Sequence, residues 1–333
     1  MTKGEWLKNS LLLNLGFVPK LLGYNDEDLF SLTQGCLKEW TNGVEYYFGL
    51  TPKGTERKPE DFPEKLVSHK LITVMHAPFA RVSYPLPLVR RIVEISKQSF
   101  YRWIRFVLLS RADQNPWQRL PSAIQVSSEI GAQKIVIHAA DIILAHHPAQ
   151  LFQKINKVSS KKNIAVCLEN TIKRRMKSKY DKPQWGAIHN PVALLQLIRE
   201  YNLDNCYLTI DTAHLAESGY MVSDKWEEIK QFAQGDINRV VGHFHLVDYI
   251  PKDRFDAAPP GTGVIGIDTF RRIIDDLFEL EYRGTISLEV APLFFYKEQH
   301  KLLVNMLKRL CPFIKTGLEG EEEYILRIIE ELL

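Results

Sequence analysis

Several features that would place this chain in a special class of protein are missing from its sequence. No apolar run reaches the roughly 20 residues that a membrane-spanning helix needs, and the N-terminus lacks the pattern of a secretory signal peptide. The four cysteines, Cys36, Cys167, Cys206 and Cys311, show no CxxC or other paired spacing, which argues against a disulfide framework. We therefore expect a cytoplasmic protein with reduced thiols and no membrane partner.

A strong charge of one sign is also absent. The 333 residues include 43 Lys and Arg against 40 Asp and Glu, so the formal net charge is +3. This mild excess permits a polyanionic partner but does not require one. With 45% hydrophobic and 25% charged residues, the composition is that of an ordinary globular protein, long enough for one large α/β domain.

Six short apolar runs each contain a histidine, aspartate or glutamate at the point where a strand would give way to a loop. Each run has about the length of a strand, is rich in β-branched residues, and is followed by Pro, Gly, Asn or Asp. Continuous apolar runs of this kind are typical of parallel strands buried on both faces. The runs are LITVMHA (71–77), KIVIHA (134–139), IAVCLEN (164–170), CYLTIDTAH (206–214), VVGHFHLVD (240–248) and TISLEVAP (285–292).

Two earlier runs, SLLLNLGF (10–17) and GVEYYFGL (43–50), bring the predicted strands to eight. The segments between strands have apolar residues at three- and four-residue spacing, as amphipathic helices do, with helix starts expected at Asn190 and at Asp268-Thr269. Eight strand–helix units predict an α/β fold, a single-domain (β/α)8 TIM barrel over residues 1–333. We also expect a helical insertion at about residues 84–120 and a C-terminal helix at about residues 318–333.

In such barrels the chemistry lies at the C-terminal ends of the strands, where the candidate ligands in the six runs fall. Burying imidazoles and carboxylates there is unfavourable unless something pairs them, and a bound metal would do so. Because side chains alternate along a strand, His243 and His245 share a face, and His245, nearer the strand end, is the better ligand. Asp211 and His214 straddle a strand end, so both can face the site.

The ordered series of motifs resembles the endonuclease IV and xylose isomerase-like superfamily of metal-dependent TIM barrels. The matching segments are HAP (76–78), VIHA (136–139), LENT (168–171), DTAHLAESGY (211–220), FHLVD (244–248), GTGVIGIDTF (261–270) and LEVAP (288–292). The resemblance implies a divalent ion, with zinc preferred and manganese or magnesium as alternatives, held by Glu169, Asp211, His245 and Glu289. It also implies a second ion at His76 and His138, with Glu169 bridging the two.

The chain departs from endonuclease IV at one position. In that family a third metal uses the position matching His214, together with an Asp-x-His pair just before the Gly-x-Gly loop. Here the segment is DRFDAAPPGTG (253–263), which has no histidine. Asp253 or Asp256 would have to replace the missing pair, so the third site is an open question.

Three sequence features bear on the substrate. The basic segment 172–185 follows Glu169, and Lys173, Arg174 and Arg175 in it can neutralise the phosphates of a nucleic acid or a sugar phosphate, or form a solvated loop. The GTGVIG loop, with its two glycines, can cradle a phosphate or simply make a tight turn. The third feature is the carboxylate of Asp248. We predict that Asp248, Gly261 and Gly263 also bind the substrate.

Two activities fit these residues, with Glu169, Glu289 and His214 as the predicted catalytic residues. The main prediction is an endonuclease IV-like phosphodiester hydrolase, in which two ions activate a water. The alternative is a sugar or sugar-phosphate isomerase or epimerase with one ion, in which Glu169 and Glu289 move protons. The missing Asp-x-His pair favours this alternative, as does Glu45, which resembles the Gly-x-Glu of isomerase-like members. A non-catalytic barrel is a third hypothesis, and the complete ligand set argues against it.

Overall fold

The computed structural model describes residues 1–15, 30, 41–47, 58–77, 116–172, 183–252, 255–289 and 327–333. The predicted insertion at about residues 84–120 lies outside these ranges except for residues 116–120, which begin a helix. The predicted substrate-binding residues Lys173, Arg174 and Arg175, together with Asp253, also lie outside the described residues.

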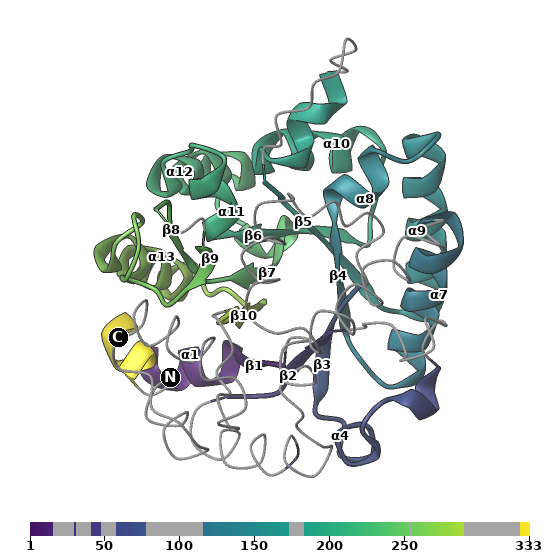
Figure 1. The fold of residues 1–333 in the computed structure, drawn as a ribbon, viewed down its shortest axis with the longest axis horizontal. Coiled ribbons are helices and arrows are strands. Elements are labelled where there is room, and N and C mark those ends of the chain that lie inside the picture. The colour runs from purple at the N-terminus through teal and green to yellow at the C-terminus, as the bar shows by residue number, and fades with distance from the viewer. Residues whose placement is uncertain are drawn as a thin grey trace, which may run out of the picture.

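In the described part of the chain, eight parallel strands close into a barrel in the order β1-β10-β7-β6-β5-β4-β3-β2 (Figure 1). Each strand falls within a run that the sequence predicts, which confirms the (β/α)8 fold. The strands are β1 Leu11–Leu15, β2 Val44–Tyr47, β3 Ile72–His76, β4 Lys134–His138, β5 Ala165–Glu169, β6 Cys206–Asp211, β7 Val241–His245 and β10 Thr285–Ser287.

Helices surround the barrel (Figure 1). The α-helices are α1 Lys3–Ser10, α4 Glu64–Ser68, α7 Pro116–Glu129, α8 Ala139–Ile143, α9 Pro148–Lys162, α10 Pro191–Glu200, α11 Thr212–Glu217, α12 Val222–Ala233 and α13 Ile267–Glu279, and the 3-10 helices are η1 Pro59–Asp61, η2 Pro183–Ile188 and η3 Ile237–Arg239. Residues 327–332 form a further helix near the C-terminus. Of the helices described, none is long and apolar enough to cross a membrane.

One predicted helix start is confirmed and the other is wrong. The Asn190 side chain accepts a hydrogen bond from the backbone N–H of Val192 and caps α10 as expected. The cap of α13 is Gly266, with φ +78°, and Asp268 lies inside the first turn. Because glycine adopts positive φ at little cost, the chain turns into the helix earlier than the Asp268-Thr269 pair suggests.

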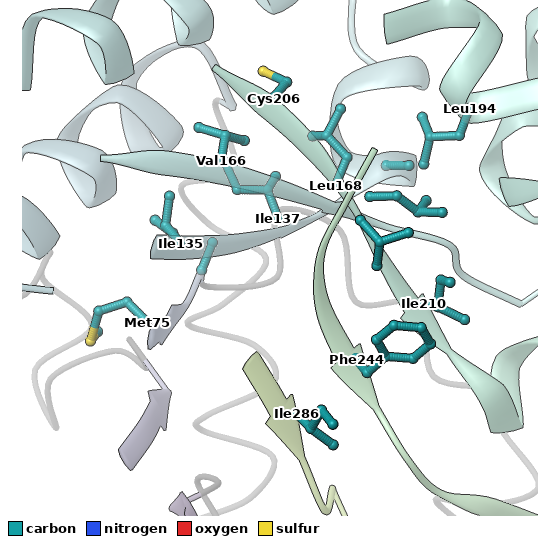
Figure 2. Packing of buried hydrophobic residues seen from close by; sticks show 14 of the residues in the cluster. Met75, Ile135, Ile137, Val166, Leu168, Leu194, Cys206, Ile210, Phe244 and Ile286 are labelled. Atoms are coloured by element: carbon teal, nitrogen blue, oxygen red, sulfur yellow. The ribbon is translucent and has the colours of Figure 1, made fainter. Parts of the chain in front are cut away.

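The strands divide their side chains between two sides, because successive side chains point to opposite faces. One set, including Ile135, Ile137 and Leu168, belongs to the main hydrophobic core (Figure 2). The alternate set on four strands forms a separate, smaller apolar cluster of Leu12, Val74, Val136 and Cys167. Two positions further along, the same face of these strands carries Asn14, His76, His138 and Glu169. The alternation therefore places polar and titratable side chains inside the barrel, toward its C-terminal end.

A two-stranded hairpin that the sequence analysis does not predict follows β7. Strand β8 (Asp248–Ile250) pairs antiparallel with β9 (Phe255–Ala258), and Asp248 lies opposite Ala258. Strand β9 takes up four residues of the segment DRFDAAPP (253–260), which the sequence analysis considers only for metal ligands. The hairpin carries Asp256 and leads into the glycine loop.

Candidate metal centre

The predicted metal ligands meet at one rim of the barrel. The final residue of each of five strands, β3 to β7, is a predicted ligand: His76, His138, Glu169, Asp211 and His245. Glu289 follows the end of β10 by two residues. Since the strands are parallel, their carboxyl ends meet at the same edge. The register places His138 opposite Glu169, and Asp211 opposite His245.

One group combines three carboxylates and one imidazole: Glu169, Asp211, His245 and Glu289. Each offers one ligand atom, and these atoms all lie within 4.8 Å of one another. The Nδ1 atom of His245 is 2.9 Å from Glu289 Oε2 and 3.7 Å from both Glu169 Oε1 and Asp211 Oδ2. The Glu289 side chain is 24% exposed, whereas Glu169 is 1% exposed, so Glu289 is the more accessible of these two carboxylates.

A second group is richer in histidine and shares one member with the first. His76 Nε2 and His138 Nε2 each lie 3.2 Å from Glu169 Oε2. The other oxygen of Glu169, Oε1, faces the first group. The arrangement is therefore one in which Glu169 can bridge two ions, as the predicted second site requires.

The polar atoms of the two groups suit a metal ion. Glu169 Oε1 and His245 Nδ1 are buried and make no hydrogen bond of regular geometry, although His214 Nδ1 lies 3.1 Å from the first atom and Glu289 Oε2 lies 2.9 Å from the second. Buried polar atoms without a well-directed hydrogen bond are rare in folded proteins and call for an explanation. Three carboxylates in one group also repel one another unless a cation balances them. Imidazole nitrogen and carboxylate oxygen are ordinary ligands of divalent ions, so the residues fit one.

The pKa shifts show how neighbouring side chains affect the charge of the carboxylates when only protein groups are present. Burial acts to raise the pKa of Glu169, but the neighbouring His138 and His245 outweigh it and hold that pKa well below its ordinary value. For Asp211, burial together with the Glu169 and Glu289 carboxylates raises the pKa against the opposing effect of His214. Burial acts to lower the pKa of His245, yet the surrounding carboxylates raise it well above the usual value. Imidazolium thus supplies positive charge where an ion would supply it.

His214 lies beside the first group, on the first turn of α11. Asp211 is the N-cap of this helix, and its Oδ1 accepts the His214 backbone N–H at 2.7 Å. His214 Nδ1 lies 3.1 Å from Glu169 Oε1 and 3.0 Å from the Asn170 carbonyl oxygen. Asn170 also exchanges two hydrogen bonds with the Asp211 backbone, which fixes the strand end. The position suits the predicted catalytic role of His214, which stays a prediction.

The third metal site of endonuclease IV does not assemble from the described residues. Among them, the groups of three or more potential ligands include neither His214 nor Asp256. Burial raises the pKa of Asp256 while His214 lowers it, so the two side chains interact without forming a ligand group.

Asp248 and the glycine loop form a closed structure of their own. Asp248 is fully buried, and its two oxygens accept four backbone N–H groups, those of Tyr249, Gly261, Gly263 and Ile265, at 2.7–3.1 Å. A Cβ on Gly263 would lie 2.4 Å from Asp248 Oδ1, and Gly261 has φ +85°. These glycine N–H groups are directed at Asp248 rather than at a ligand, which is the tight-turn alternative. Substrate binding by Asp248, Gly261 and Gly263 stays a prediction, and their described contacts are those of a loop anchor.

The sequence analysis misses one aromatic residue at the site. The ring of Tyr47 stacks on His76, with centroids 4.2 Å apart and planes 6° from parallel, and its hydroxyl donates a hydrogen bond to Glu289 Oε1. Tyr47 follows Glu45 by two positions in β2, so the alternation of strand side chains was the signal that could have found it.

The profile of the xylose isomerase-like TIM-barrel family matches residues 41–308. No curated protein matches the chain. Among solved structures, an L-ribulose 3-epimerase is similar at TM-score 0.54 and 13% identity, covering 96% of this chain and 95% of its own.

Two further solved structures match this chain with similar TM-scores and sequence identities. A D-allulose 3-epimerase from Methylomonas sp. has TM-score 0.52 and 15% identity over 97% of this chain and 98% of its own. A D-tagatose 3-epimerase-like protein has TM-score 0.51 and 16% identity over 90% and 97%. At these identities the structures show a shared fold, while the profile match covers most of the chain. The protein therefore belongs to the xylose isomerase-like TIM-barrel family.

Proposed function

We propose that this protein is a divalent-metal-dependent isomerase or epimerase that acts on a small sugar or sugar phosphate. The observation that carries the proposal is that Glu169 and Glu289, two carboxylates from different strands, belong to one ligand group at the barrel rim. The epimerases that share the fold along nearly their whole length support it. This reverses the order of the two functions in the sequence analysis, where phosphodiester hydrolysis was the main prediction.

The four residues that would hold the ion are Glu169, Asp211, His245 and Glu289. When bound, a divalent ion would polarise the carbonyl and hydroxyl oxygens of the sugar. His245 and the carboxylates fix where such a substrate can lie, because they converge within 4.8 Å. His214, next to Glu169 Oε1, is placed to donate a hydrogen bond to a substrate oxygen.

The two glutamates would move the proton. One carboxylate would take a proton from the carbon next to the carbonyl and later release it to solvent, and the other would take up a proton from solvent and deliver it to the opposite face, which inverts that carbon. The pKa of Glu289 is lowered, since His245 outweighs the effect of burial, so this carboxylate is ionised and can accept a proton. Its exposed fraction of 24% also makes it the carboxylate that a substrate reaches more easily. The Tyr47 hydroxyl holds Glu289 Oε1 in place.

One observation favours phosphodiester hydrolysis as the second candidate. The group of His76, His138 and Glu169 offers a place for a second ion, which a two-metal hydrolase needs and a one-metal epimerase does not. The basic residues Lys173, Arg174 and Arg175, which were predicted to contact phosphates, lie outside the described residues and add no support.

A paired assay separates the two functions. Metal-loaded protein is incubated in D₂O with a panel of ketoses and ketose phosphates, and deuterium at the carbon next to the carbonyl is followed by NMR. The same preparation is incubated with a duplex that carries an abasic site. We expect deuterium incorporation by the wild type, its loss in Glu169→Gln, and an intact duplex.

The variant His138→Ala is the matched control, because it removes a residue of the second group and leaves the first complete. It should retain most of the exchange. Cleavage of the duplex that is lost in both Glu169→Gln and His138→Ala, with no exchange into any sugar, would overturn the proposal in favour of hydrolysis.

A further inference from the structure

A second set of buried polar side chains lies one layer deeper in the barrel than the metal ligands. Its centre is Glu45 of β2, which is fully buried together with His243 of β7. Asn14 of β1 is 9% exposed, and Thr285 begins β10. None of these residues is among the predicted ligands, so their burial needs a separate explanation.

Both oxygens of Glu45 are occupied by side chains from two other strands, β1 and β7. Oε2 lies 3.0 Å from Asn14 Nδ2 and 3.3 Å from His243 Nε2, and Oε1 lies 3.0 Å from His245 Nε2. Each of these oxygens lies within 3.3 Å of an imidazole Nε2 atom, and because a carboxylate accepts hydrogen bonds, both Nε2 atoms are donors.

His243 is held in one tautomer by its two neighbours. Its Nε2 lies 3.3 Å from Glu45 Oε2 and therefore carries the N–H, and its Nδ1 accepts a hydrogen bond from the Thr285 hydroxyl at 2.7 Å. Lys134 Nζ lies 3.2 Å from the same hydroxyl oxygen. The hydrogen-bonded chain thus runs from Lys134 at the start of β4 to Glu45.

His245 connects this deeper layer with the metal centre. Its Nε2 faces Glu45 at 3.0 Å, while its Nδ1 faces Glu289 at 2.9 Å and lies 3.7 Å from Glu169 and Asp211. With an ion bound, Nδ1 would lose its proton, and a ring that donates Nε2–H to Glu45 would present the Nδ1 lone pair to the ion. Carboxylates that accept from the second nitrogen of a ligating histidine fix the tautomer and orientation of the ring and raise its basicity.

We propose that Glu45 is a positioning residue for the metal centre, which fixes His245 with Nδ1 toward the ion, and that Asn14 and His243 hold Glu45 for this purpose. The proposal rests on the divalent ion of the proposed function but not on its sugar chemistry. It assigns the deeper layer a specific effect, which is to raise metal affinity through His245.

The test measures metal binding without any sugar. Metal-free protein is titrated with Co²⁺, whose visible absorption reports the geometry and number of its ligands. Glu45→Gln keeps the size of the side chain and one acceptor oxygen but removes the negative charge. We expect Co²⁺ to bind about 10- to 100-fold more weakly to Glu45→Gln, as for other partners of ligating histidines, with an altered absorption band.

Two further variants keep the result interpretable. Asp276→Asn makes the same chemical change in a carboxylate that accepts from Trp226 and Lys230 and contacts no predicted ligand, and it should leave Co²⁺ affinity and the spectrum unchanged. Asn14→Ala removes one donor to Glu45 without touching His245, and it should weaken binding by a smaller factor than Glu45→Gln. If Glu45→Gln binds Co²⁺ like the wild type, with the same spectrum, the proposal is wrong.

Other outcomes are equally decisive. Glu45 also belongs to a potential ligand group with His76 and His245. If His76→Ala weakens the tightest Co²⁺ site as much as Glu45→Gln does, then Glu45 is itself a ligand and the positioning role is overturned. A wild type that binds Co²⁺ tightly but exchanges no sugar proton would contradict the proposed function and leave the role of Glu45 standing. A wild type that binds no Co²⁺ would overturn both.

Discussion

The metal centre and the glycine loop lie at the same rim of the barrel, and each buries a carboxylate. The two carboxylates have different kinds of hydrogen-bond partner. In the metal centre, Glu169 lies within 3.2 Å of three imidazoles, those of His76, His138 and His214. In the glycine loop, the groups that donate to Asp248 in the described part of the chain are all backbone N–H groups. Backbone donors cannot lose a proton or move aside, whereas imidazoles can do both. The kind of partner, more than burial or position at a strand end, separates a carboxylate available to an ion from one that is part of the scaffold.

The largest effect that this comparison predicts on stability is at Asp248. Asp248→Ala leaves four backbone N–H groups without their acceptor, and each buried one that stays unsatisfied costs about 1–3 kcal/mol. Since the loop is partly exposed and water can reach some of these groups, we expect a total loss of about 3–5 kcal/mol in the free energy of unfolding. Urea denaturation of the metal-free protein measures it.

Asp248→Asn is the control for this prediction, because its remaining side-chain oxygen can still accept. It should lose clearly less stability than Asp248→Ala, and both variants should bind metal as the wild type does. A fall in metal affinity in Asp248→Asn comparable to that of a ligand variant would mean that the loop and the centre are one unit, contrary to the comparison.

A smaller effect is expected at Tyr47, which touches both ligand groups. Tyr47→Phe keeps the ring on His76 and removes the hydroxyl that donates to Glu289. A hydrogen bond to a charged group contributes about 1.5–3 kcal/mol, so we expect kcat of the isomerase to fall by about tenfold or somewhat more, with little change in KM or in stability. Steady-state kinetics on the sugar identified by the deuterium assay measure the effect, and a wild-type kcat would remove Tyr47 from the site.

The barrel and the positions of the ligands follow from the sequence for a simple reason. Apolar, β-branched runs predict buried parallel strands, and parallel strands bring their carboxyl ends together. His76, His138 and Glu169 each end a run, so their meeting at one rim needs no knowledge of long-range packing. The alternation of side chains likewise predicts that His245, one layer above His243, is the residue that reaches the centre.

The remaining features depend on contacts that no local pattern encodes. Asp248 also follows an apolar run, and only the folded loop shows that its oxygens are used by backbone N–H groups from residues 261–265. Glu45 is visible as part of a motif, but its contacts with His243 and His245 join strands about 200 residues apart. Tyr47 likewise meets Glu289, which is 242 residues away in the sequence.

Metal content per chain is the measurement that tests most directly whether Glu169 is a metal ligand and Asp248 is part of the scaffold. Wild type, Glu169→Gln and Asp248→Asn are saturated with Zn²⁺ or Mn²⁺, dialysed, and analysed for metal by mass spectrometry. Because Glu169 belongs to both ligand groups, we expect at least one ion per chain in the wild type and in Asp248→Asn, and about a tenth of that or less in Glu169→Gln, which loses a charged ligand. Equal metal content in Glu169→Gln and the wild type, or no retained ion in the wild type, would contradict the metal centre described above.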